Sequence, residues 1–197
     1  NAVLAGARIT ALLADLAAEI AHSGKRDSAF DPPYTTIHVG SLHGGSALNL
    51  VPDRAVLEYE IRNIPDSDGG IPALLKRIEA GMSAERTALR TSAPEADIHV
   101  EEIAAYPQLA TPADHPAIAA VADLADARAK PRTVSFGTEA GLYAATGIPT
   151  VICGPGDMTR AHKADEWIGL DELTATDRML QRLAGKLRKP AATWMTT

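Results

Sequence analysis

The chain has 197 residues, of which 46% are hydrophobic and 22% charged, and its formal net charge is −6 at pH 7. This length and apolar content suffice for a sizeable core, and the acidic balance argues against a nucleic-acid-binding platform. The sequence contains no uninterrupted run of about 18 apolar residues, so it predicts no membrane span. The single cysteine, Cys153, excludes a disulfide framework and a zinc ribbon. We therefore expect a soluble, cytoplasmic protein with neither a nucleic-acid nor a membrane partner.

The first half of the chain predicts a small α+β domain. Apolar residues at spacings of three and four predict a helix over residues 1–20. Alternating patterns predict strands over 35–43 and 54–64, and then come a helix over 71–89 and a third strand over 97–104. The order α-β-β-α-β is that of an α+β sandwich without its first strand. Because the chain starts inside a helix and not with methionine, we expect it to be a fragment of a longer protein.

The second half predicts a different architecture. A proline-punctuated connector begins at Tyr106, so we expect one domain over residues 1–105 and another over 106–197. Beyond the connector, the pattern predicts strands over 133–136 and 149–153, and helices over 115–129, 139–146 and 171–187. Strands that alternate with helices favour a mostly parallel sheet with helices on its faces, which makes the fold class α/β.

Three positions offer chemistry beyond packing. His162 follows a predicted strand and a Gly-Pro-Gly turn, where an imidazole could bind a metal ion or be an ordinary loop histidine. Arg62 ends a strand, and its guanidinium fits either a ligand carboxylate or a surface salt bridge. The turn Gly137-Thr138-Glu139 opens a helix, where it could bind an anion or serve only as a cap.

These residues lie in motifs that resemble a known family. The motifs are Ile37-His38-Val39-Gly40, the stretch 43–52, Tyr59-Glu60-Ile61-Arg62, the stretch 136–141, Cys153-Gly154-Pro155-Gly156 and the stretch 161–166. Together they resemble the zinc-dependent M20-type metallohydrolases, a family that includes aminoacylases and carboxypeptidase-like enzymes. Within the family they are most similar to the acetylornithine deacetylase branch. The resemblance covers nearly the whole chain.

The resemblance implies a fold and a set of roles. It implies a ferredoxin-like lid and dimerisation domain, followed by the C-terminal part of an α/β zinc-peptidase-like catalytic domain. His162 would be a metal ligand, and Arg62 with Gly137 and Thr138 would bind the substrate carboxylate. Asn49 would reach the active site of a neighbouring subunit, and Glu139 would bind the substrate ammonium group. The general base and the other metal ligands would lie upstream.

The implied activity is hydrolysis of a small N-acyl amino acid by a homodimer. Two Zn²⁺ ions would bind each full-length subunit, with Co²⁺ as an alternative metal. The substrate would be N2-acetyl-L-ornithine, which yields ornithine and acetate in arginine biosynthesis. The alternatives are a succinyl-diaminopimelate desuccinylase, a general aminoacylase, and a non-catalytic dimerisation or binding fragment of such an enzyme. The fragment alone is expected to be inactive.

Overall fold

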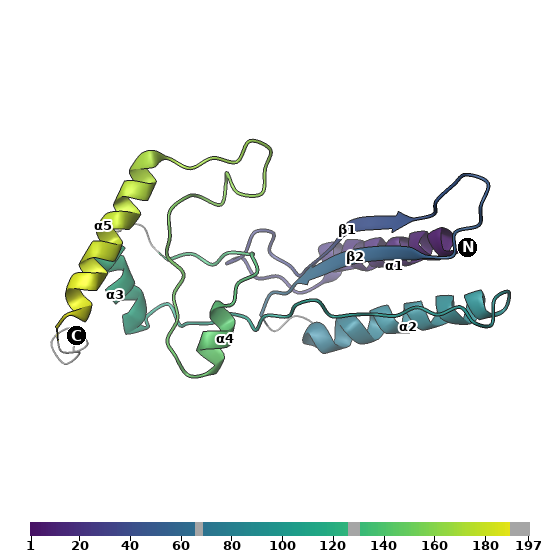
Figure 1. The fold of residues 1–197 in the computed structure, drawn as a ribbon. Helices are drawn as coiled ribbons and strands as arrows, with labels where there is room; N and C mark the ends of the chain where they lie inside the picture. The colour runs from purple at the N-terminus through teal and green to yellow at the C-terminus, as the bar shows by residue number, and fades with distance from the viewer. Residues whose placement is uncertain (66–68, 126–130, 190–197) are drawn as a thin grey trace. The chain divides into compact units, whose positions relative to one another are not determined.

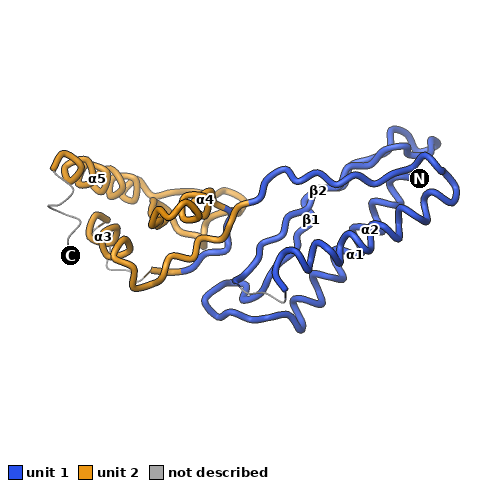
Figure 2. Tube along the Cα trace, turned by 90° about the horizontal axis from the view of Figure 1, so that it is seen from below, with its two compact units in different colours: residues 1–105, 133–137 blue, residues 106–132, 138–197 orange. Residues whose placement is uncertain are grey.

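The structure, a computed structural model, describes residues 1–65, 69–125 and 131–189. Its elements in these ranges are α1 (Ala2–Ser23), β1 (Thr36–Gly44), β2 (Ala55–Arg62), α2 (Gly70–Arg90), α3 (Pro116–Ala125), α4 (Ala140–Ala145) and α5 (Leu170–Leu187), shown in Figure 1. The chain divides into two compact units (Figure 2). Unit 1 comprises Asn1–Ala105 and Thr133–Gly137, and unit 2 comprises Tyr106–Arg132 and Thr138–Thr197.

Unit 1 contains an antiparallel pair of strands, as the alternating patterns predicted. Thr36 at the start of β1 lies opposite Arg62 at the end of β2, and Gly44 lies opposite Ala55. The register shifts once, between Val39 and Ser41. Side chains alternate between the two faces of a strand, so the polar residues of β2 share the face that points away from the core.

The core of unit 1 lies between this sheet and the helices α1 and α2. The core side chains are Ile9, Leu13 and Leu16 of α1 and Leu74, Ile78 and Met82 of α2, with Ile37, Val39, Leu57, Tyr59 and Ile61 of the strands packed against them. Leu13 has no exposed surface. The first turn of α1 is capped by Asn1, whose Oδ1 accepts a hydrogen bond from the backbone N–H of Leu4 at 3.1 Å. The helices predicted over 1–20 and 71–89 and the strands predicted over 35–43 and 54–64 are thus confirmed.

The third predicted strand, over residues 97–104, does not form. A strand needs a neighbour for its backbone hydrogen bonds, and here side chains of α2 take that role. Arg90 donates through Nε to the carbonyl of Ala96 at 2.9 Å, and Arg86 donates through Nη2 to the carbonyl of Ile98 at 3.0 Å. Asp97 pairs with both arginines. The segment is therefore tied to a helix, and its alternating pattern was wrongly interpreted as a strand.

Unit 2 is built around the packing of α3 against α5. Arg182 of α5 donates through Nε to the carbonyl of Leu124 at 2.7 Å, and Lys186 forms an ion pair with Asp123 at 2.8 Å. Leu124 is buried, as is Ala140 in α4. The three predicted helices are present, although the part of the first over 126–129 lies outside the described residues.

The predicted parallel sheet of the second half is also wrong for the described parts of the chain, where β1 and β2 form the one sheet. Residues 133–136 and 149–153 form no strand. Backbone carbonyls in both segments again accept hydrogen bonds from side chains. Thr111 Oγ1 donates to the carbonyl of Thr150 at 2.6 Å, and Arg62 donates to the carbonyl of Ser135. Both segments lack the hydrogen-bonded neighbour that would make them strands.

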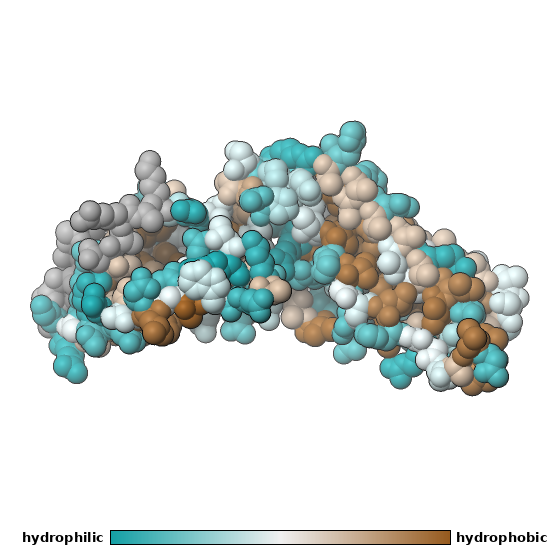
Figure 3. Space-filling model, turned by 90° about the horizontal axis from the view of Figure 1, so that it is seen from above, coloured by the Kyte–Doolittle hydropathy of each residue, from teal (hydrophilic) through white to brown (hydrophobic). Residues whose placement is uncertain are grey.

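Unit 1 exposes large apolar side chains in the connection between β1 and β2. Leu48 is fully exposed, and Leu50 and Val51 are more than half exposed. In the space-filling view of Figure 3, apolar residues lie open on the surface of unit 1. Contiguous exposed apolar surface often marks an interaction site. None of the helices in the described ranges has the length and apolar content that crossing a membrane requires.

Candidate functional site

Arg62 is the predicted site residue with the most contacts in the structure. Its Nε donates a hydrogen bond to Oε1 of Glu60 at 2.9 Å, and its Nη2 lies 2.8 Å from the same oxygen. Its Nη1 donates to the backbone carbonyl of Ser135 at 3.0 Å. The side chain of Arg62 remains 37% exposed. The guanidinium thus forms the salt bridge that was one of its two predicted roles, and it stays accessible to a ligand.

The contact with Ser135 brings Arg62 to a second predicted site segment. Residues 133–137 belong to unit 1, although they are distant from the rest of it in sequence. Thr133 donates through its hydroxyl to the carbonyl of Ala29, which fixes the start of this segment. Gly137, at its end, is two residues beyond the carbonyl that Arg62 contacts and is exposed. Arg62 and the segment that ends at Gly137 are therefore neighbours within one unit.

Two residues at this place were not among the predicted site residues. Glu60 and Arg62 are two residues apart on one strand and therefore share a face, so their spacing could have indicated the pairing. Ser135 gave no such signal, because its contact joins positions 73 residues apart. Its Oγ is buried and has no hydrogen-bond partner among the described residues. A buried hydroxyl without a hydrogen-bond partner lowers the stability of the fold, so Ser135 is an unusual position next to Arg62.

Asn49 lies at the opposite end of the strands from Arg62. It is exposed in the connection that joins β1 to β2, whereas Arg62 is the last residue of β2 (Figure 1). At ~3.3 Å per residue, β2 alone separates Ala55 from Arg62 by about 23 Å. Within one chain the structure therefore does not bring Asn49 and Arg62 together.

The turn before α4 is a cap in this structure. Thr138 Oγ1 accepts a hydrogen bond from the backbone N–H of Ala140 at 3.2 Å, whereas the exposed Glu139 makes no capping hydrogen bond with its side chain. The helix that follows spans six residues. A Cβ added at Gly141 would lie 1.8 Å from the carbonyl oxygen of Pro107, so a glycine is needed there for the close backbone approach.

His162 lies in an exposed loop of unit 2. Its φ of 57° is in the left-handed region, which is uncommon for a residue other than glycine. Its backbone N–H donates to Oε2 of Glu166 at 2.9 Å, which holds the loop across four residues. The same loop is anchored by Arg160, which pairs with Glu172 of α5 at 2.5 Å. That hydrogen bond, together with one from the backbone N–H of Gly169, lowers the pKa of Glu172.

The described residues do not by themselves provide a metal site. Catalytic zinc sites use three protein ligands and an open position. No group of three or more histidine, cysteine, aspartate or glutamate side chains lies together within the described ranges. His162 is thus a single candidate ligand, and the described chain does not fit a two-metal centre on its own.

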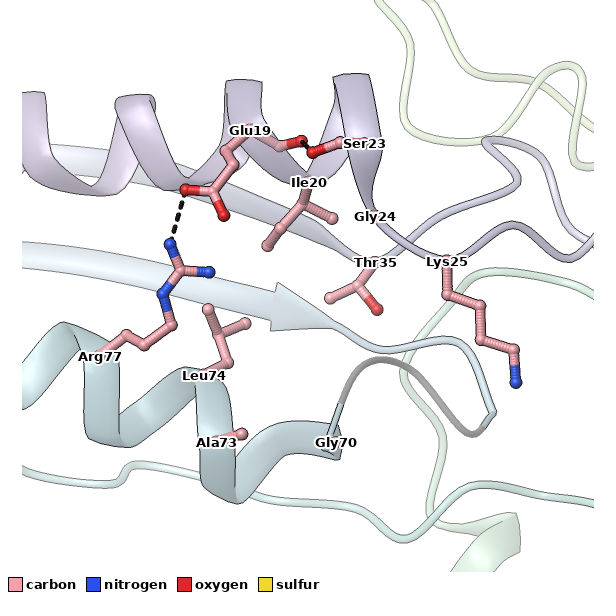
Figure 4. A pocket seen from close by; sticks show the side chains of 10 residues that line it. All are labelled: Glu19, Ile20, Ser23, Gly24, Lys25, Thr35, Gly70, Ala73, Leu74 and Arg77. Atoms are coloured by element: carbon pink, nitrogen blue, oxygen red, sulfur yellow. Dashed lines mark hydrogen bonds and ion pairs between the residues drawn. The ribbon is translucent and has the colours of Figure 1, made fainter.

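The cavity shown in Figure 4 contains none of the predicted site residues. It has a volume of about 290 Å³ and lies between the end of α1 and the start of α2. The ion pair of Glu19 with Arg77, 2.6 Å long, lines it. That pairing lowers the pKa of Glu19. Glu19 and Arg77 thus neutralise each other within the cavity, whose lining does not include Arg62.

Several known proteins are similar in sequence to this chain. Residues 1–85 match the family described as "Peptidase dimerisation domain". The chain is 32% identical over 156 residues to the acetylornithine deacetylase of Myxococcus xanthus, a match that covers 79% of this chain and 39% of the relative. It is 27% identical to the acetylornithine deacetylase of Photorhabdus laumondii, over 79% of this chain and 38% of the relative.

A third relative gives the same result. The chain is 27% identical to the acetylornithine deacetylase of Vibrio cholerae over 161 residues, which are 80% of this chain and 39% of the relative. The chain thus spans about two fifths of the length of the curated relatives it matches. The match to the Myxococcus protein covers more residues than unit 1 contains, so the similarity extends into unit 2.

Proposed function

Because residues 1–85 match the dimerisation domain of the M20 peptidases, we propose that the whole protein belongs to this family and is a metal-dependent amidohydrolase that deacetylates N2-acetyl-L-ornithine. Water is added across the amide bond, and the products are L-ornithine and acetate. The observation that carries this proposal is the similarity to proteins named acetylornithine deacetylase over about four fifths of the chain, in both units.

Arg62 supplies the contact with the substrate carboxylate in this proposal. A guanidinium offers five N–H groups in a planar fork that matches a carboxylate. Arg62 is partly exposed and lies beside the segment that ends at Gly137. The N–H groups of Gly137 and Thr138 would bind the same carboxylate, and the exposed Glu139 would bind the ammonium group of the ornithine side chain.

His162 supplies one metal ligand in this proposal. The metal, Zn²⁺ or Co²⁺, would polarise the amide carbonyl and activate water when bound. The remaining ligands and the general base would come from residues other than those the structure describes.

The proposed enzyme is a homodimer in which Asn49 acts in the active site of the partner subunit. The match of residues 1–85 to a dimerisation domain supports the association. The separation of Asn49 from Arg62 along β2 supports action across subunits, because one small substrate cannot span about 23 Å. The exposed Leu48, Leu50 and Val51, which flank Asn49, would then be covered by the partner.

Substrate preference of the whole protein tests the proposal. The purified protein, loaded with Zn²⁺ or Co²⁺, is assayed with N2-acetyl-L-ornithine, N-succinyl-L,L-diaminopimelate and N-acetyl-L-methionine at equal concentrations. We expect the highest kcat/KM for N2-acetyl-L-ornithine. A higher value for the succinylated substrate would identify a desuccinylase, and a higher value for the methionine derivative would identify a general aminoacylase. Hydrolysis of none of them would identify a non-catalytic protein.

A further inference from the structure

Glu60 holds one edge of the Arg62 guanidinium. The two residues lie two positions apart on the outward face of β2, and a single oxygen of Glu60 lies 2.9 Å from Nε and 2.8 Å from Nη2. On the other side, Nη1 donates to the backbone carbonyl of Ser135. All three guanidinium nitrogens therefore contact groups of the chain itself, from two segments that are 73 residues apart in sequence.

We propose that Glu60 is a positioning residue, which, with the carbonyl of Ser135, orients Arg62 so that its remaining N–H groups receive one substrate carboxylate. The inference rests on the proposed function, because it takes Arg62 as the carboxylate-binding residue. Each terminal nitrogen of a guanidinium carries two N–H groups. Nη1 uses one of its two for Ser135 and Nη2 directs one toward Glu60, which leaves one on each nitrogen for a bidentate contact.

The benefit of this arrangement is preorganisation and not added charge. An arginine side chain has many rotamers. If it becomes fixed in one of them only when the ligand binds, the lost conformational entropy weakens the affinity. Glu60 and Ser135 restrict those rotamers before the substrate arrives. The carboxylate of Glu60 also cancels the charge of Arg62, so removing it strengthens the attraction for an anion while it loosens the guanidinium. These two effects have opposite signs, and variants at position 60 separate them.

Two variants distinguish positioning from charge competition. Glu60→Gln keeps an oxygen that can accept from Nε but has no charge, whereas Glu60→Ala removes both the acceptor and the charge. If Glu60 positions Arg62, Glu60→Gln stays close to the wild type and Glu60→Ala is impaired. If Glu60 competes with the substrate carboxylate, both variants bind the substrate more tightly. Glu58→Ala is the matched control, because Glu58 lies on the same face of β2 but accepts from Ser41 Oγ.

The first measurement uses the 197-residue chain and needs no activity. Exchange of the Arg62 Nε proton with water is followed by NMR, with the chain labelled with ¹⁵N. We expect a protected Nε–H signal in the wild type, in Glu60→Gln and in Glu58→Ala. We expect at least about tenfold faster exchange in Glu60→Ala, because the hydrogen bond is lost. An Nε–H of Arg62 that exchanges equally fast in the wild type and in Glu60→Ala would overturn the proposal regardless of the enzymatic function.

The second measurement uses the whole protein. The ratio of kcat/KM for N2-acetyl-L-ornithine to that for its carboxamide, which lacks the carboxylate, reports how strongly the carboxylate is recognised. We expect Glu60→Ala to reduce this ratio at least about fivefold through a higher KM, with kcat nearly unchanged and Glu60→Gln close to the wild type. An unchanged or increased ratio in Glu60→Ala would overturn the positioning role. Absence of hydrolysis in the wild type would overturn the proposed function, and this role with it.

Discussion

At the end of β2, Arg62 is the residue that we propose to bind the substrate carboxylate. A charge-assisted hydrogen bond contributes about 1.5–3 kcal/mol. We predict that Arg62→Ala lowers kcat/KM of the whole protein for N2-acetyl-L-ornithine at least about tenfold, since about 1.4 kcal/mol corresponds to that factor. Arg62→Lys recovers only part of the loss, because an ammonium lacks the planar fork. Arg188→Ala, at the exposed end of α5, is the control, and wild-type kinetics in Arg62→Ala would contradict the assignment.

Gly141 is required by a close approach of two backbone segments in unit 2. A methyl group at this position would lie 1.8 Å from the carbonyl oxygen of Pro107, and a backbone atom cannot move away as easily as a side chain. Overpacking of this kind costs about 1–3 kcal/mol. We predict that Gly141→Ala lowers the free energy of unfolding of unit 2 by this amount.

The measurement for Gly141 is urea unfolding followed by tryptophan fluorescence, because both tryptophans of the chain, Trp167 and Trp194, fall in the residue range of unit 2. Gly154→Ala is a matched control, because a Cβ added there has no atom within 4 Å. We expect the unfolding midpoint of Gly154→Ala to stay at the wild-type value. Equal midpoints for Gly141→Ala and Gly154→Ala would show that the approach of Pro107 to α4 is absent in solution.

At the scale of elements, α1 and α2 are held to the sheet by a small core centred on Leu13. This side chain has no exposed surface, and truncating a buried leucine to alanine costs about 2–5 kcal/mol. We predict that Leu13→Ala lowers the free energy of unfolding of unit 1 by that amount, measured by far-ultraviolet circular dichroism in urea. Leu170→Ala removes the same atoms from the start of α5, where the side chain is 80% exposed, and is expected to leave the free energy of unfolding nearly unchanged. Similar losses in both variants would contradict the described core.

The segment after α2 is tied to that helix by Asp97, and this attachment depends on pH. A hydrogen bond from the backbone N–H of Ile98, together with nearby Arg90, His99 and Arg86, lowers the pKa of Asp97. A carboxyl whose pKa is lower in the folded state stabilises the fold above its unfolded pKa of about 3.9. That stabilisation is lost as the pH falls through the folded-state pKa.

We therefore predict that Asp97→Asn is less stable than the wild type at pH 7, and that the difference disappears on acidification below about pH 3.9. Urea midpoints measured from pH 7 down to pH 2.5 check this. Asp15→Asn, which removes a carboxylate from an exposed position of α1, serves as the control. If the wild type were still more stable than Asp97→Asn by the same amount at pH 2.5, the ion pairs of Asp97 with α2 would be contradicted.

Local sequence patterns predicted the elements that carry their own periodicity. Apolar residues at spacings of three and four, such as Leu12, Leu16 and Ile20, predicted α1, and alternation through Leu57, Tyr59 and Ile61 predicted β2. In both elements these residues lie in or against the core. The segments over 97–104, 133–136 and 149–153 have suitable residues for strands but no partner strand in the described structure. Pairing is a property of two segments, so a pattern in one of them could not predict it.

In the candidate site, too, contacts between residues close in sequence could be predicted and contacts between distant residues could not. The pairing of Glu60 with Arg62 follows from their spacing on one strand and could have been predicted. The contact of Arg62 with the carbonyl of Ser135 could not, since nothing in the local sequence indicates that residues 133–137 pack within unit 1. The left-handed φ of His162 could not be predicted either, because the residue is not a glycine and its conformation depends on the surrounding loop.

At the scale of the whole molecule, the proposed active site is completed by residues of two subunits. The sheet of unit 1 has two strands, so each strand has an edge that is unpaired within the described residues. Exposed strand edges and apolar surface favour association. Together with the match of residues 1–85 to a dimerisation domain, this leads us to expect a homodimer in which Asn49 and His162 of different subunits serve the same substrate.

Mixing two inactive variants of the whole protein tests this claim most directly. Asn49→Ala and His162→Ala subunits are each expected to be nearly inactive as homodimers. After they are unfolded together and refolded as a mixture, half of the dimers are mixed. One of the two sites in each mixed dimer then has both residues, so about a quarter of the wild-type activity toward N2-acetyl-L-ornithine is expected to return. No recovered activity in a mixture that ultracentrifugation shows to be dimeric, or a monomeric wild type, would contradict the account.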